Sequence, residues 1–130
     1  GDETEFYEEL KAKLKKDTRW QAKKIYINLI EQEEDMAEIM AYVRENPHYI
    51  VRYAELLKDN YADEVDELYS NHIRSAAHSS SKRSAYQDVC GLIRQYKNIV
   101  GKDNAAELVN ELLVLYKKKR AFVDELSKLD

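Results

Sequence analysis

The spacing of apolar residues between positions 86 and 116 constrains the fold more than any other feature of this sequence. In its first half, the apolar side chains recur every three or four residues, which places them on one side of an α-helix. They are Tyr86, Val89, Cys90, Ile93, Tyr96, Ile99 and Val100. Gly101 is expected to end this helix, because glycine readily adopts the conformations found at helix ends. Asp103 can cap a second helix, whose expected buried residues are Leu108, Val109, Leu112, Leu113, Leu115 and Tyr116.

Two such helices joined by a short turn predict an antiparallel helical hairpin. The composition extends this prediction to the whole chain, because three glycines and one proline among 130 residues are too few for the many turns of a β-protein. The chain also lacks the roughly 18 consecutive apolar residues of a membrane helix, and its N-terminus does not resemble a signal peptide. We therefore expect one cytosolic, all-helical domain over residues 1–130. Its single cysteine fits a reducing compartment.

Similar apolar spacing predicts helices along the rest of the chain. Asp17 or Thr18 is expected to cap a helix that has Trp20 and Ile25 on its docking side. Asp35 is expected to cap the helix after it, which must stop before Pro47. Pro47 suits the first turn of the next helix. The other residues expected to face inward are Phe6, Tyr7, Leu10, Leu14, Tyr26, Leu29, Ile30, Met36, Ile39, Met40, Val43, Ile50, Tyr53, Ala54, Leu57, Val65, Leu68, Tyr69, Ile73, Ala76, Ala77, Phe122, Val123, Leu126 and Leu129.

These patterns give about eight helices in stacked antiparallel hairpins. Each hairpin is too short to bury its own apolar side alone, which is typical of a helical repeat array. The predicted fold class is therefore all-α, either an α-α superhelix of the tetratricopeptide kind or a compact helical bundle.

No combination of reactive side chains predicts a catalytic, cofactor or metal site. His72 and His78 lie six residues apart, about 240° around a helix, and cannot chelate one ion together. Glu45 and His48 have the spacing of a di-iron motif, but Pro47 breaks the helix between them. Cys90 falls on an apolar helix side, where a buried, unreactive thiol is expected. We expect a protein that is not an enzyme and that needs no cofactor.

Two features could bind a partner. Ten tyrosines against two phenylalanines could line a groove for a peptide or nucleic acid, although most fall on predicted core positions. Four consecutive cations, Lys117, Lys118, Lys119 and Arg120, could bind phosphate or an acidic partner. They could instead complement the helix dipole and pair with Asp124 and Glu125. The net charge of −4 argues weakly against a dedicated nucleic-acid binder, although residues 66–130 carry a net charge of +2.

Several residues spread over most of the chain occur in an order that is typical of one protein family. They are Asn46-Pro47, Arg52-Tyr53, Leu56-Leu57, Arg74, Ala76-Ala77, Arg83, Tyr86, Gly101, Tyr116-Lys117-Lys118-Lys119-Arg120-Ala121-Phe122 and Asp124-Glu125-Leu126. This order resembles the helical C-terminal region of bacterial SWIM zinc-finger proteins. Lys117 and Arg120 stand where that family often has proline, and the zinc-binding cysteines and histidines that name the family are absent.

The resemblance implies a tetratricopeptide-like accessory domain from the C-terminal end of a longer cytosolic protein. Together with the helical pattern, it favours a non-enzymatic interaction module that binds a protein partner or other domains of the parent chain. Binding of nucleic acid through the basic C-terminal half is the alternative, and no contact with a membrane is expected.

Overall fold

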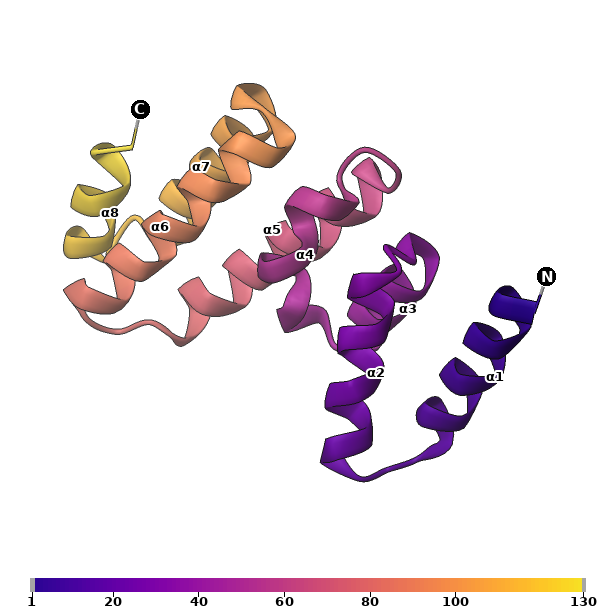
Figure 1. Cartoon of the computed structure of the whole chain (residues 1–130). Coiled ribbons are helices and arrows are strands. Elements are labelled where there is room, and N and C mark those ends of the chain that lie inside the picture. The colour runs from indigo at the N-terminus through magenta and orange to yellow at the C-terminus, as the bar shows by residue number, and fades with distance from the viewer. Residues whose placement is uncertain (1, 130) are drawn as a thin grey trace. The chain divides into compact units, whose positions relative to one another are not determined.

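The computed structural model describes residues 2–129, and the regular secondary structure of this part of the chain is all helical, without strands (Figure 1). It contains α1 (Asp2–Lys16), α2 (Trp20–Gln32), α3 (Met36–Glu45), the 3₁₀ helix η1 (Pro47–Tyr49), α4 (Ile50–Leu57), α5 (Ala62–Ser79), α6 (Arg83–Val100), α7 (Lys102–Leu115) and α8 (Arg120–Ser127). The prediction of an all-α fold with about eight helices is confirmed. Pro47 begins the element after α3, as its missing N–H favours.

The helices form two compact units, residues 1–45 and residues 46–130, which we call the N-terminal and C-terminal units. Each unit has its own set of packed helices. The expected single domain and the expected superhelix both stay predictions.

In the N-terminal unit, α2 packs against both α1 and α3. Asp35 caps α3 as predicted, because its side chain accepts a hydrogen bond from the Glu38 N–H at 3.2 Å. The cap predicted for α2 is wrong. Asp17 instead bonds the backbone N–H of Arg19 at 3.0 Å and its guanidinium group, and α2 begins without a side-chain cap. The carboxylate of Asp17 therefore closes the turn before the helix.

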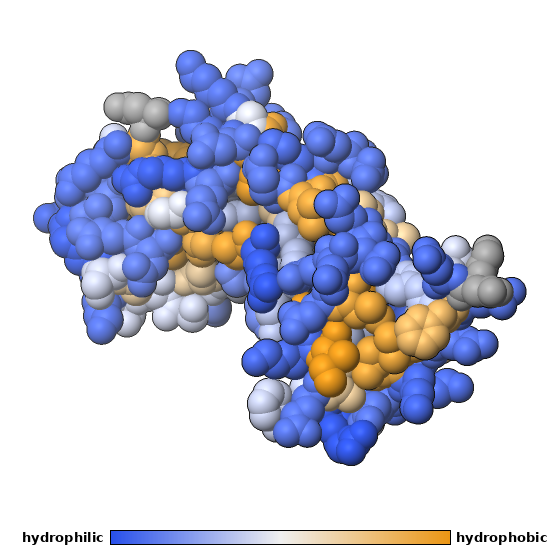
Figure 2. Space-filling model, viewed as in Figure 1, coloured by the Kyte–Doolittle hydropathy of each residue, from blue (hydrophilic) through white to orange (hydrophobic). Residues whose placement is uncertain are grey.

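One side of the N-terminal unit is apolar and exposed. Figure 2 shows apolar residues gathered over α1 and α2. Trp20 is 70% exposed and Ile25 is 54% exposed, so the prediction that both dock on neighbouring helices is wrong. The buried side of α2 carries Ala22, Tyr26 and Ile30 instead. In this unit α1 and α3 pack against α2 but leave Trp20 and Ile25 uncovered.

In the C-terminal unit, α6 is the central helix and packs against α4, α5, α7 and α8. Its buried residues are Tyr86, Val89, Cys90, Ile93 and Tyr96, as the spacing predicted. Gly101 ends α6 with φ +97° and ψ 167°, a backbone conformation that side chains disfavour. Its N–H donates to the Lys97 carbonyl at 2.9 Å.

The start and the end of α7 differ from the prediction. Asp103 lies inside the first turn, after Lys102, and Gly101 occupies the N-cap position, so the predicted Asp103 cap is wrong. Leu108 and Leu112 are buried, but Leu115 is 65% exposed. The ring of Phe122 from α8 contacts Tyr116 at the end of α7, with centroids 5.3 Å apart. Because α8 covers the Tyr116 side of this end, Leu115 remains in solvent.

The closing helix α8 folds back on α6, and both Phe122 and Leu126 are fully buried, as predicted. Arg83 at the start of α6 contacts Asp124 at 2.8 Å and Glu125 at 2.6 Å. The prediction that these carboxylates pair with the cations of residues 117–120 is therefore wrong. Arg83 reaches them because α8 returns across the first turn of α6.

Candidate binding groove

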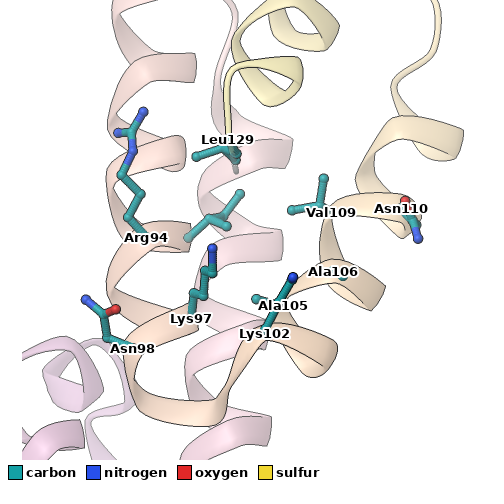
Figure 3. Close-up of a pocket in the computed structure, with 10 residues that line it drawn as sticks. Arg94, Lys97, Asn98, Lys102, Ala105, Ala106, Val109, Asn110 and Leu129 are labelled. Atoms are coloured by element: carbon teal, nitrogen blue, oxygen red, sulfur yellow. The ribbon is translucent and has the colours of Figure 1, made fainter.

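A groove with a volume of about 520 Å³ lies in the C-terminal unit between α6, α7 and the residues that follow α8. Figure 3 shows the side chains around it. The lining residues are Ile93, Arg94, Lys97, Asn98, Lys102, Ala105, Ala106, Val109, Asn110 and Leu129. Five of them are exposed at the surface, so the groove opens to solvent.

The local sequence explains why a groove forms here. The turn at Gly101 reverses the chain and places α7 along α6. Two consecutive alanines, Ala105 and Ala106, lie on α7, where larger side chains would fill the space. Ile93 and Val109 supply an apolar floor from the two helices, and Leu129 closes one end after α8. The floor can therefore bury aliphatic groups of a ligand.

The polar part of the groove is cationic. Arg94, Lys97 and Lys102 line it together with two asparagines, and no acidic residue is among the lining residues. Among residues 3–129, no acidic side chain forms an ion pair with any of these three cations. In Figure 3, Lys97 and Lys102 extend toward the space next to Val109 and Leu129, whereas Asn98 points away from α7. The first turn of α7, which holds Lys102, adds the positive end of a helix dipole.

This arrangement can hold a ligand that is apolar at its centre and anionic at its edges. Lysine and arginine side chains donate charge-assisted hydrogen bonds to carboxylates and phosphates. Val109 and Leu129 offer the apolar contact beside them, above the buried Ile93. The groove can therefore bind and orient such a ligand.

A smaller cavity of about 140 Å³ lies between α5 and the turn that joins α6 to α7. Asp66 lines it, and this carboxylate already accepts hydrogen bonds from Tyr96 and, at 3.2 Å, from Asn104. Burial and the bond to Asp66 raise the pKa of Tyr96. The cavity therefore belongs to the packing of the unit.

The four cations predicted as a partner site lie in the turn between α7 and α8 and at the start of α8, all exposed. They do not line the groove. Lys119 is held locally: its Nζ donates to the Ser80 carbonyl at 3.4 Å and lies 5.1 Å from the centroid of the Tyr116 ring. Partner binding through Lys117, Lys118, Lys119 and Arg120 stays a prediction.

Cys90 and the histidines are the other residues considered for chemistry. Cys90 is buried, and burial raises the pKa of its thiol, so the prediction of a buried cysteine is confirmed. Burial lowers the pKa of the half-buried His72. Within residues 3–129, no three His, Cys, Asp or Glu side chains are grouped closely enough to hold a metal ion. Several tyrosines do fill the core, including Tyr26, Tyr69 and Tyr96.

The groove was not predicted from the sequence, although part of its signal is visible there. Arg94 and Lys97 are three apart beside the buried stripe of α6, and Lys102 follows the glycine turn. Cations before and after a hairpin turn indicate that the two helices carry a basic surface near the turn. What the sequence could not show is the approach of Leu129 from a third element.

Comparison of the chain with protein-family models, with curated proteins and with solved structures found no match. None of the helices between residues 2 and 129 combines the length and apolar character that crossing a bilayer requires.

Proposed function

We propose that this chain is a non-enzymatic, helical protein-interaction module that binds a protein partner, or another part of a longer parent protein, through the groove of its C-terminal unit. The observation that carries this proposal is the groove itself, in which an apolar floor lies beside polar and charged residues. Protein interfaces commonly combine an apolar centre with a polar rim.

The resemblance to the helical C-terminal region of SWIM zinc-finger proteins supports the same role. That resemblance includes Gly101, which forms the turn beside the groove, and Phe122, which fixes α8 on α6. On this basis, the chain is an accessory domain of a cytosolic protein. Its lone, buried cysteine is compatible with a reducing compartment.

Affinity capture with paired variants tests the proposal. The whole chain is immobilised, and proteins retained from a lysate of the source cells are identified by mass spectrometry. Val109→Asp places a carboxylate in the groove floor, whereas Val114→Asp makes the same change at a residue of α7 that is 73% exposed and outside the groove. Circular dichroism first establishes that both variants keep their helical content.

The proposal predicts at least one protein that is retained by the wild-type chain and by Val114→Asp but lost with Val109→Asp. Retention of the same proteins by all three chains would contradict it, because the groove would then be irrelevant to binding. A wild-type chain that retains no protein would contradict it as well.

A second candidate function is nucleic-acid binding through residues 117–120. It is favoured by Lys117, Lys118 and Arg120, which are exposed and have no acidic partner between residues 2 and 129. Fluorescence anisotropy with labelled single-stranded DNA and RNA at several salt concentrations tests it. Replacing the four cations by glutamine should weaken binding and flatten its dependence on salt. No binding at low salt would refute this candidate.

A further inference from the structure

We propose that the occupant of the groove is an acidic amphipathic α-helix of the partner protein, with apolar residues on one side and Asp or Glu beside them. This inference rests on the proposed function and names the chemistry of the partner. The shape of the groove, the hydrogen bonding of its backbone and its charge each favour this occupant.

The shape favours the side of a helix. The groove runs between two packed helices, α6 and α7, and Ala105 and Ala106 let an incoming element approach closely. A helix with its side chains is about 10 Å wide, so only its apolar side can enter a groove of about 520 Å³. Val109 and Leu129, which are partly exposed, would then contact aliphatic side chains of that helix. Residues spaced at i, i+3, i+4 and i+7 supply such a side.

The backbone around the groove excludes binding by strand addition. In that mode, an extended peptide adds to the edge of a sheet, where free backbone groups pair with its own. The lining residues of α6 and α7 lie in helices, whose backbone groups bond within each helix. A helical ligand satisfies its own backbone hydrogen bonds, so it can bind here without needing any from the groove.

The charges select an acidic helix over a basic one. Arg94, Lys97 and Lys102 surround the apolar floor, and like charges brought together at an interface disfavour binding. The whole chain has a net charge of −4, which alone would repel an acidic partner. At physiological ionic strength, charges are screened over about 8 Å, so the three cations that line the groove outweigh acidic residues elsewhere on the chain.

A synthetic peptide tests the proposal directly. The probe is a fluorescent amphipathic peptide of about 14 residues, long enough for nearly four helical turns, with leucine on one side and glutamate beside it. A matched peptide has lysine in place of each glutamate. Anisotropy measures the binding of each peptide to the wild-type chain, to Lys97→Glu/Lys102→Glu, and to Lys117→Glu/Lys118→Glu, which makes the same charge change outside the groove.

The expected result is that the acidic peptide binds the wild-type chain and the Lys117→Glu/Lys118→Glu variant alike. It should bind Lys97→Glu/Lys102→Glu about tenfold more weakly, because two attractive contacts become repulsive. The basic peptide should bind that variant better than it binds the wild-type chain. Such a gain cannot come from a variant that has merely failed to fold.

Three outcomes would overturn the proposal. They are equal binding of the acidic peptide to the wild-type chain and Lys97→Glu/Lys102→Glu, an equal loss with Lys117→Glu/Lys118→Glu, and no binding of this peptide even at low salt. A labelled single-stranded oligonucleotide that competes for the groove and displaces the acidic peptide would assign the groove to nucleic acid instead. If captured proteins depend on Val109 while the acidic peptide does not bind, the interaction function stands and the acidic helix is wrong.

Discussion

The ring of Phe122 lies almost parallel to the ring of Tyr86, with centroids 4.7 Å apart and an angle of 7° between the planes. This stacking joins α8 to α6, and the contacts of Arg83 with Asp124 and Glu125 lie along the same pair of helices. Leu129 follows α8 and lines the groove. The position of Phe122 therefore fixes one end of the proposed binding surface.

Replacing Phe122 by alanine should detach α8 from α6. Loss of a fully buried phenylalanine typically lowers the free energy of unfolding by about 3–5 kcal/mol, and Phe122 is fully buried. Urea unfolding followed by circular dichroism measures the change. Relative to the wild-type chain, hydrogen exchange should also accelerate more in α8 than in α5.

Val114→Ala is the control for this substitution, because Val114 is a large apolar residue in solvent. Changes at such surface positions usually alter stability by less than about 0.5 kcal/mol. If Phe122→Ala were no more destabilising than Val114→Ala, the packing of α8 described here would be wrong.

Gly91 inside α6 and Gly101 at its end should respond to alanine in opposite directions. At Gly101, with φ +97°, alanine should lower the free energy of unfolding by about 1–3 kcal/mol, since side chains strain this conformation. Gly91 lies inside α6, and an added Cβ there meets no heavy atom within 4 Å. Alanine at Gly91 should stabilise the chain by about 0.5–1 kcal/mol.

Thermal and urea unfolding of both glycine variants provide the measurement. Equal effects of the two substitutions would contradict the conformation of Gly101 and the turn that shapes the groove. The comparison is well matched because both variants add one methyl group to the same hairpin.

The N-terminal unit should lose stability in acid through Glu38. Burial alone would raise the pKa of this carboxyl, but hydrogen bonds from Lys15 and Tyr26 outweigh burial and lower it. A folded-state pKa below the unfolded value of about 4.3 means that the stabilisation is complete above that pH. It is lost as the pH falls below about 4.3 and through the lower, folded pKa.

The variants Tyr26→Phe and Glu38→Gln test this assignment. Removing the Tyr26 hydroxyl, which donates to the ionised Glu38 carboxylate, should cost about 1.5–3 kcal/mol at neutral pH. Glu38→Gln should make unfolding of the unit less dependent on pH between about 3 and 5. An unchanged acid transition in Glu38→Gln would show that other carboxylates, such as Asp35, control it.

Apolar spacing predicted the helices well because burial imposes a repeating pattern. The inward sides of α4 and α6 and the stop at Gly101 were all visible in the sequence. Errors occurred where a residue had more than one available partner. Asp17 bonds Arg19 instead of capping α2. Leu115 has apolar spacing but lies on the side of the α7 end that α8 does not cover.

Contacts between residues far apart in the chain were the least predictable from sequence. Arg83 pairs with Asp124 and Glu125 across about forty residues, and a local charge pattern favoured the nearer cations. The groove was missed for the same reason, since Leu129 meets Ile93 and Val109 only after the helices have packed. The apolar pattern of a helix can be recognised from neighbouring residues, whereas the groove depends on how separate helices pack together.

Hydrogen-exchange mass spectrometry of the chain, alone and bound to a protein that it retains, tests the central claim most directly. Our account predicts slower exchange in the parts of α6 and α7 that line the groove, residues 93–98 and 102–110, and unchanged exchange in residues 117–120. Protection confined to segments outside the groove, such as residues 117–120, would contradict it.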